Sequence, residues 1–175
     1  ENAPGTVAQK IGDLYNMVMD STRRNAEGTA AVKPLMDEVA AIKEKSEIIP
    51  LIARNYRVGI GGFFGTGIGT DIMNSNVNQL GIYQGGLSLP EKEYYSDNDD
   101  NTLYIRAKFN DYVVNMFKLH GFSEEEAMQK RDAVLAIETR IAAKHLSRVE
   151  RRNPLSSYHK MSYADLKEEI PGIDW

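Results

Sequence analysis

The sequence predicts a mainly α-helical fold that contains one small β-hairpin. Apolar residues recur at the 3.6-residue period of a helix through most of the chain. Residues 59–86 interrupt this pattern and hold nine of the fourteen glycines. Within that stretch, short apolar runs lie on both sides of a polar Asn74–Asn76 segment, which is typical of two strands joined by a turn.

Composition sets limits on the class of protein. A chain of 175 residues suits one domain, and 42% hydrophobic with 26% charged residues is ordinary for a globular protein. A mild net charge of −4 does not suggest nucleic-acid binding, which would need a basic face. Without cysteine there is no disulfide or thiolate chemistry, and no apolar run reaches the roughly 18 residues of a membrane span. The start lacks the features of a signal peptide, and the ending at Trp175 suggests a piece of a longer chain.

Two helices are expected in the first 45 residues. The first has its apolar face between Val7 and Val18 and begins after Thr6, a residue type that caps helices. Asn25–Gly28 is interpreted as a turn. The second helix is expected from about Lys33, because Pro34 is well tolerated in a first turn.

A third helix is expected to begin at Ser46 as its cap and to carry apolar residues up to Tyr56. Pro50 is compatible with this helix only because it lies near the start. Gly59 is the expected C-terminal cap.

The hairpin is expected to occupy about residues 60–84, from Phe63 to Tyr83 in its apolar part, inserted between helical parts with its turn near Asn74–Asn76. A glycine-rich stretch also raises the possibility of phosphate binding. The spacing matches neither G-x-G-x-x-G nor G-x-x-x-x-G-K-[ST], so nucleotide binding is not favoured.

Residues Gly85 to Tyr95 are expected to connect the hairpin to the helices that follow. The Gly85-Gly86 pair allows a positive φ, and Pro90 pushes the residue before it toward an extended conformation. Glu91 to Tyr95 then suits one helical turn. The residues alone therefore indicate a rigid connector.

Three helices are expected after an acidic loop over residues 96–101. One carries an apolar face from Ile105 to Phe117 and ends at Gly121. The next begins with a Ser123–Glu126 capping box, runs to about Arg151, and is stopped by Asn153-Pro154. The last is short, begins near Ser162–Asp165, and ends at Pro171-Gly172.

Candidate catalytic and metal-binding groups do not form a recognisable centre. His120, His145 and His159 have no pair at the four-residue spacing of a helical metal site. His120 is expected at a helix end, His145 in the long helix near its apolar stripe, and His159 in a loop. The three therefore indicate structural or surface roles.

The acidic loop of Asp97, Asp99 and Asp100 fails the calcium-loop pattern, because Thr102 and Lys108 stand where glycine and glutamate are required. It is interpreted as a solvated loop.

A basic cluster comprises Arg148, Arg151 and Arg152. It is expected to complement the dipole at the C-terminus of the long helix, or alternatively to pair with carboxylates across a lobe interface. No residue of this chain is assigned as catalytic, cofactor-binding or metal-ligating.

The amino-acid sequence of the chain resembles the N-terminal region of the neprilysin and endothelin-converting-enzyme family of zinc metallopeptidases. The connector matches the family's Gly-Gly-Leu-x-Leu-Pro-x-x-x-Tyr-Tyr signature, and other matches follow in the family's order along nearly the whole chain. They are Ile11–Tyr15, Met19-Asp20, Lys33–Leu35, Ile42, Phe63–Gly65, Asp71, Gln84–Pro90, Glu138, Ile141-Ala142, Arg151, Asn153-Pro154, Tyr158, Lys160–Ser162, Leu166 and Trp175.

This resemblance implies that residues 1–175 are a fragment of the N-terminal, non-zinc region of a two-lobed zinc endopeptidase acting on oligopeptides. The zinc motif H-E-x-x-H belongs to the C-terminal part and is absent here, so the zinc of the full-length parent is not expected on this segment. The implied partners are the C-terminal catalytic lobe and oligopeptide substrates, in an extracytoplasmic location: periplasmic, cell-surface or secreted. The family's extracellular animal members commonly have a cysteine soon after the early tyrosine. Here Tyr15 is followed by Asn16, Met17 and Val18, which favours a cysteine-free, bacterial-type member. The alternative is a stand-alone helical interaction module without catalysis.

Overall fold

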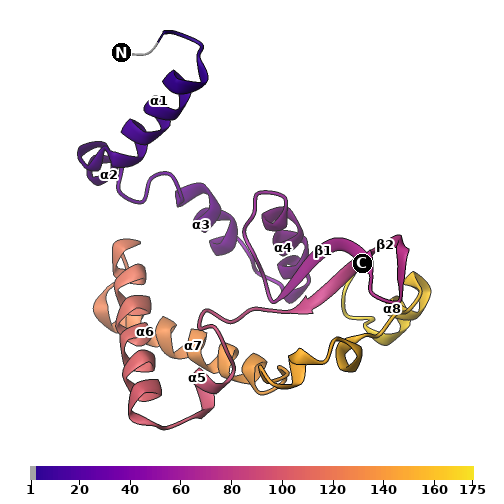
Figure 1. Cartoon of the computed structure of the whole chain (residues 1–175). Helices are drawn as coiled ribbons and strands as arrows, with labels where there is room; N and C mark the ends of the chain where they lie inside the picture. The colour runs from indigo at the N-terminus through magenta and orange to yellow at the C-terminus, as the bar shows by residue number, and fades with distance from the viewer. Residues whose placement is uncertain (1–2) are drawn as a thin grey trace. The chain divides into compact units, whose positions relative to one another are not determined.

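The computed structural model describes residues 3–175, which hold eight α-helices and one two-stranded antiparallel hairpin (Figure 1). The prediction of a mainly α fold with a single hairpin is confirmed. The chain divides into two compact units at the junction of Ile42 and Lys43.

The first unit contains α1 (Val7–Met19), α2 (Ser21–Glu27) and α3 (Lys33–Ala40). The side chain of Thr6 accepts a hydrogen bond from the amide of Gln9, so its predicted capping role is confirmed. None of the three helices has a buried residue. This unit therefore lacks a core of its own within the described residues.

The turn predicted over Asn25–Gly28 is wrong for most of its length, because α2 continues to Glu27. Asp20 caps this helix by accepting from the amide of Arg23, and an ion pair at 2.6 Å joins Arg23 to Glu27 one turn later. Gly28, with φ +54°, then ends the helix.

The second unit begins with a 3₁₀ turn (Lys45–Glu47) that leads into α4 (Ile48–Tyr56). Ser46 is not the cap that the sequence suggested. Glu44 and Glu47 form a reciprocal capping box around the 3₁₀ turn, and this box takes over the role of a serine cap. The C-cap of α4 is Arg57, two residues before the predicted Gly59, which has φ +81° and redirects the chain toward the hairpin.

The hairpin consists of β1 (Phe64–Asp71) and β2 (Asn74–Gln84). The predicted position is confirmed, but the turn lies at Ile72-Met73 and not at Asn74–Asn76. The reason is local: the carboxylate of Asp71 accepts from the amide of Met73 at 2.9 Å, which closes the turn two residues earlier.

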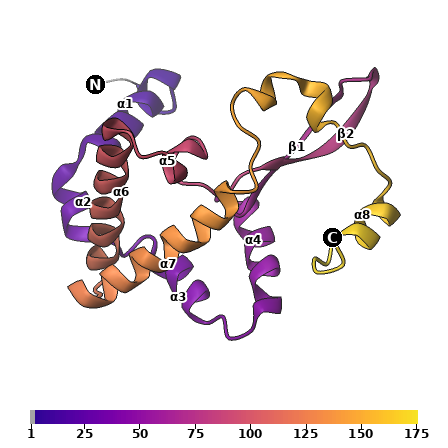
Figure 2. The same cartoon turned by 90° about the horizontal axis from the view of Figure 1, so that it is seen from below.

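Three helices follow the hairpin: α5 (Glu93–Ser96), α6 (Asp100–Leu119) and α7 (Glu124–Ala142). Figure 2 shows α6 and α7 joined by a short turn, where Gly121 has φ +91° and Ser123 forms the predicted capping box with Glu126. A small core joins the connector to these helices. Its buried members are Leu89, Tyr95 and Ala142, with Leu87, Tyr94, Ile105 and Phe109 packed around them.

The long helix predicted up to Arg151 ends at Ala142. Beyond it the backbone of Leu146 exchanges two hydrogen bonds with the side-chain amide of Gln84 at the base of the hairpin, at 3.0 and 3.2 Å. These tertiary contacts turn the chain away from the helix axis.

Two 3₁₀ turns (Glu150–Arg152 and Pro154–Ser157) and α8 (Tyr163–Glu169) complete the unit. Ser162 caps α8 through a capping box with Asp165, as predicted. Over residues 3–175, no helix combines the length and the apolarity that crossing a membrane would require.

Candidate functional site

Glu138, on the buried side of α7, holds the connector in place. It is 9% exposed, and one of its oxygens accepts from the Ser88 hydroxyl at 2.7 Å while the other accepts from the Ser88 amide at 3.3 Å. The Tyr95 hydroxyl donates to Glu138 at 2.5 Å and accepts from the Leu89 amide at 2.9 Å. In this cluster, the connector clamp, the polar groups of the buried Glu138 and Tyr95 are therefore paired, and the exposed Ser88 supplies two of the donors.

Burial and the adjacent Glu138 carboxylate both raise the pKa of the Tyr95 phenol well above its ordinary value. The hydroxyl of Tyr95 therefore remains a hydrogen-bond donor throughout the physiological range. A carboxylate that receives three donors, and a phenol that keeps its proton, suit a static support better than proton transfer at neutral pH.

The base of the hairpin is fixed by a second group of polar contacts. His145 Nε2 lies 3.0 Å from the carbonyl oxygen of Gly85, which requires a proton on Nε2, and the carbonyl of His145 accepts from Lys92 Nζ at 2.9 Å. The prediction that His145 lies in the long helix is wrong, because this residue follows the end of α7. It acts as a link between the connector and the segment after α7.

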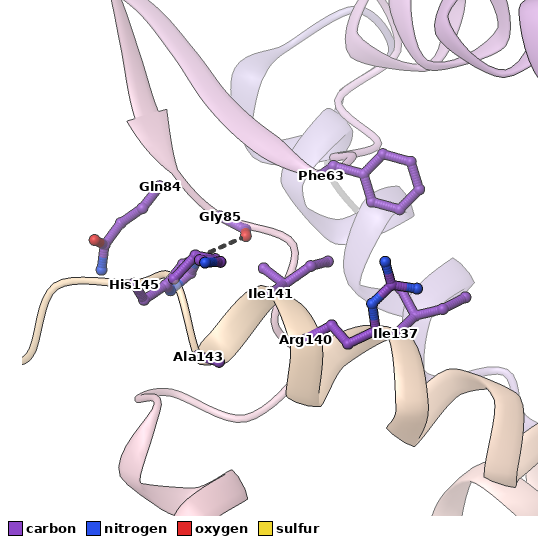
Figure 3. Close-up of a pocket in the computed structure, with 9 residues that line it drawn as sticks. Phe63, Gln84, Gly85, Ile137, Arg140, Ile141, Ala143 and His145 are labelled. Carbon is purple, nitrogen blue, oxygen red and sulfur yellow. Dashed lines mark hydrogen bonds between the residues drawn. The ribbon is translucent and has the colours of Figure 1, made fainter.

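A groove of about 760 Å³ opens beside these contacts (Figure 3). Phe63, Ile137 and Ile141 form its apolar walls, and Arg140 and Lys144 supply positive charge. Figure 3 shows the guanidinium of Arg140 and the ring of Phe63 on the same side of the groove. These apolar walls and basic side chains suit a ligand with an apolar side chain next to a carboxylate group.

The far end of the hairpin is held by Asp71, which is 1% exposed. Its carboxylate accepts from Lys160 Nζ at 2.6 Å, from the Tyr158 hydroxyl at 2.8 Å and from the Met73 amide at 2.9 Å. The hydrogen bond from Lys160 is the main cause that lowers the pKa of Asp71 to about 2, and the same bond raises the pKa of Lys160. This tip lock ties the hairpin to a segment almost ninety residues later in the chain.

The arginine cluster does not lie at the C-terminus of a long helix, so the dipole interpretation is wrong for it. The structure gives one of the three a defined partner: Arg151 pairs with Glu91 in the connector. This contact is internal to the chain, and pairing across a lobe interface stays a prediction.

The remaining candidate residues from the sequence lie at helix caps or in a connecting segment. His120 is the C-cap residue of α6, as predicted, and His159 lies in the segment after Pro154. Asp99 caps α6 by accepting from the amides of Asn101 and Thr102. Within residues 3–175, no three His, Cys, Asp or Glu side chains come together as a potential metal site.

No pattern in the sequence links the members of the connector clamp. Ser88 and Glu138 lie fifty residues apart, so no local pattern links them. One signal was available: Glu138 lies four residues after Val134 and three before Ile141, which puts a charged side chain on an apolar helical stripe. A charge in such a position indicates a buried, partnered group.

Comparison with known proteins identifies the family. A model of Peptidase family M13 matches residues 1–175, and the chain belongs to this family. Endothelin-converting enzyme 1 of Homo sapiens is 28% identical over 190 residues, which cover 100% of this chain and 24% of that protein. Neprilysin-3 of Drosophila melanogaster is 31% identical over 112 residues, 64% of this chain and 14% of that protein.

The fold is likewise similar to that of a solved bacterial enzyme. The cryo-EM structure of the zinc metalloprotease Zmp1 of Mycobacterium tuberculosis in its open state matches with a TM-score of 0.85 and 28% identity. The match covers 100% of this chain and 27% of that one. The chain thus spans about a quarter of the length of endothelin-converting enzyme 1 and of the Zmp1 chain. The resemblance to the neprilysin and endothelin-converting-enzyme family is confirmed.

Proposed function

We propose that residues 1–175 are a segment of the N-terminal, non-zinc region of a zinc-dependent endopeptidase that hydrolyses oligopeptides. The segment forms part of the lobe that encloses the active-site cavity and gates access to it. The observation that supports this proposal most directly is the extent of the family match. The family model matches all 175 residues, yet the chain covers only about a quarter of a related enzyme such as endothelin-converting enzyme 1. In this proposal the C-terminal catalytic lobe is the partner, and it supplies the zinc and the catalytic base.

The fixed hairpin and the exposed surface of α1 favour a role for this segment as a scaffold that docks onto another part of the protein. The connector clamp, the tip lock and the base contacts, which are those of Leu146 with Gln84 and of His145 with Gly85, fix the hairpin at both ends. The hairpin is therefore presented as a rigid arm. The apolar stripe of α1 is exposed at Ile11, Leu14 and Val18. Exposed apolar surface of this kind is typical of a contact with another part of a protein.

The test is to produce this segment and the catalytic remainder as separate chains in one cell. We expect hydrolysis of an oligopeptide only when both chains are present, and a zinc chelator should abolish it. A matched control replaces this segment by an unrelated helical domain of similar length. If the catalytic part alone is folded, equally active and equally selective, the proposal is wrong.

The alternative function is a stand-alone helical interaction module without catalysis. The exposed stripe of α1 is the observation that favours it, because an amphipathic helix can lie in the groove of an unrelated partner. The same two-chain experiment separates the two functions. A module would bind its partner without any gain of peptide hydrolysis.

We further propose an extracytoplasmic location for the parent protein, on the basis of the family resemblance. Fractionation of cells that produce the tagged full-length protein tests this. A tag found only in the cytoplasmic fraction would overturn it.

A further inference from the structure

The two faces of the hairpin differ sharply in composition. The register pairs Thr66 with Ile82 and Ile68 with Leu80, so these four side chains project from one face. The alternate positions of β1 are Gly65, Gly67 and Gly69, so on the opposite face β1 contributes no side chain over this stretch and only Gln79 and Tyr83 project from β2. The hairpin therefore has one aliphatic face and one face, called the bare face here, on which β1 is glycine alone.

The bare face is partly covered by the hairpin's own Tyr83. A Cβ added at Gly65 would lie 3.6 Å from the Cβ of Tyr83, and one added at Gly67 would lie 3.9 Å from its ring. At Gly81 an added Cβ would collide with the Tyr83 hydroxyl. Glycine is needed at this last position so that the ring can lie along the strand.

The aliphatic face has no such cover. Ile68 is 82% exposed and Leu80 is 64% exposed, although they oppose each other in the middle of the hairpin. A two-stranded hairpin with an uncovered apolar face is marginally stable in water. The tip lock and the base contacts nevertheless hold both ends of it, so the face is rigidly preformed, which lowers the entropic cost of docking.

We propose that this aliphatic face, centred on Ile68 and Leu80, packs against an apolar surface of the remaining part of the same longer polypeptide. The inference rests on the proposed function and names the docking surface. The length of the related enzyme indicates what covers this face. Because the match covers 27% of the Zmp1 chain, about three quarters of such a polypeptide lies outside residues 1–175 and is available to pack against it. A peptide substrate would pair with a strand edge, whereas a flat aliphatic face suits a packed helix or sheet.

Thiol labelling of the full-length polypeptide tests the proposal, because residues 1–175 contain no cysteine to interfere. The variants are Ile68→Cys and Leu80→Cys. The control is Leu119→Cys at the end of α6, which at 65% exposure matches Leu80. Labelling rates of the native protein are compared with those in denaturant, and the modified peptide is identified by mass spectrometry.

We expect native labelling at positions 68 and 80 to be at least about 20-fold slower than in denaturant, and labelling at position 119 to change by less than about threefold. Equal labelling at all three positions would overturn the proposal. Protection that disappears on dilution would overturn it in favour of a second copy. Protection that needs added oligopeptide would overturn it in favour of substrate.

A binding measurement between the separate chains distinguishes failure of this inference from failure of the proposed function. Ile68→Thr keeps a β-branched residue, so the strand is retained while apolar surface is lost. We expect this variant to weaken association about tenfold, and Leu119→Thr to change it less than about twofold. If the unsubstituted chains do not associate, the proposed function is wrong; if they associate and Ile68→Thr binds equally well, only the docking face is wrong.

Discussion

At the scale of single residues, Glu138 has the largest expected effect on stability. Replacing it by alanine removes the acceptor of the exposed Ser88 hydroxyl and of the buried Tyr95 hydroxyl. We expect Glu138→Ala to lower the free energy of unfolding by about 1–3 kcal/mol, because the buried Tyr95 hydroxyl loses its acceptor and keeps its desolvation penalty.

Urea unfolding followed by circular dichroism measures this effect. Glu125→Ala, at an exposed position of the same helix, should change the free energy of unfolding by less than about 0.5 kcal/mol. Equal losses for the two variants would show that the clamp does not stabilise the chain.

Asp71 gives the chain a pH-dependent contribution to stability. Its pKa is about 2 in the folded chain against an ordinary 3.8, so folding favours the ionised carboxylate. This contribution is complete above about pH 4 and is lost as the pH falls toward 2. We expect Asp71→Asn to be less stable than the unsubstituted chain at pH 7, with the difference shrinking below pH 4.

Unfolding midpoints in urea at pH 7, 4 and 2.5 provide the measurement. Asp111→Asn is the control, since Asp111 is exposed and lies 4.0 Å from Lys108. The idea fails if the difference between Asp71→Asn and the unsubstituted chain is the same at pH 7 and pH 2.5.

At the scale of elements, the entry into the connector depends on Gly86. Gly86 and Gly59 have nearly the same φ, +79° and +81°. A Cβ at Gly86 would lie 2.8 Å from the carbonyl oxygen of Phe63, whereas a Cβ at Gly59 meets nothing within 4 Å. The two positions therefore separate backbone strain from steric collision.

We expect Gly59→Ala to cost about 1–2 kcal/mol, which is the strain of a left-handed alanine. Gly86→Ala should cost at least about 1 kcal/mol more, because the backbone at Phe63 must also move. Thermal unfolding of the two variants provides the comparison. Equal losses of stability in the two variants would mean that the backbone near Phe63 moves to accommodate the added Cβ at no measurable free-energy cost.

At the scale of the whole molecule, the two units differ in how much they bury. The helices α1, α2 and α3 have no buried residue, whereas α6 and α7 bury Val113, Ala127 and Ala142 among others. Short helices without tertiary packing are marginal in water. In the isolated chain we expect amides of α1 to exchange at least about 100-fold faster than those near Val113.

Hydrogen exchange read by mass spectrometry measures this difference. The same peptides in the full-length polypeptide serve as the control, where docking should slow the exchange of α1. Equal protection of α1 and α6 in the isolated chain would contradict the prediction.

The isolated segment is also predicted neither to bind zinc tightly nor to cleave peptides. The reason is the spacing of His120, His145 and His159, which presents no helical ligand pair. Titration calorimetry at neutral pH is the measurement. Stoichiometric binding with a submicromolar dissociation constant would contradict it.

The sequence by itself determined the class of fold and the starts of four helices, α1, α3, α7 and α8. Thr6, Ser123 and Ser162 cap helices where the sequence predicts, because a cap needs only a side chain and an amide two or three residues away. The glycine-rich stretch likewise marked the hairpin. The ordered matches along the chain were sufficient to indicate the family.

Tertiary structure alone decided the end of α7 and the members of the candidate site. Apolar spacing continues past Ala142, but the contacts of Leu146 with Gln84 and of His145 with Gly85 outweigh it. The clamp and the tip lock each join residues at least 43 positions apart, and the energy of such contacts depends on a geometry that local patterns do not encode. Short-range propensity therefore specified the elements, while long-range hydrogen bonds in buried surroundings specified how the second unit holds its hairpin.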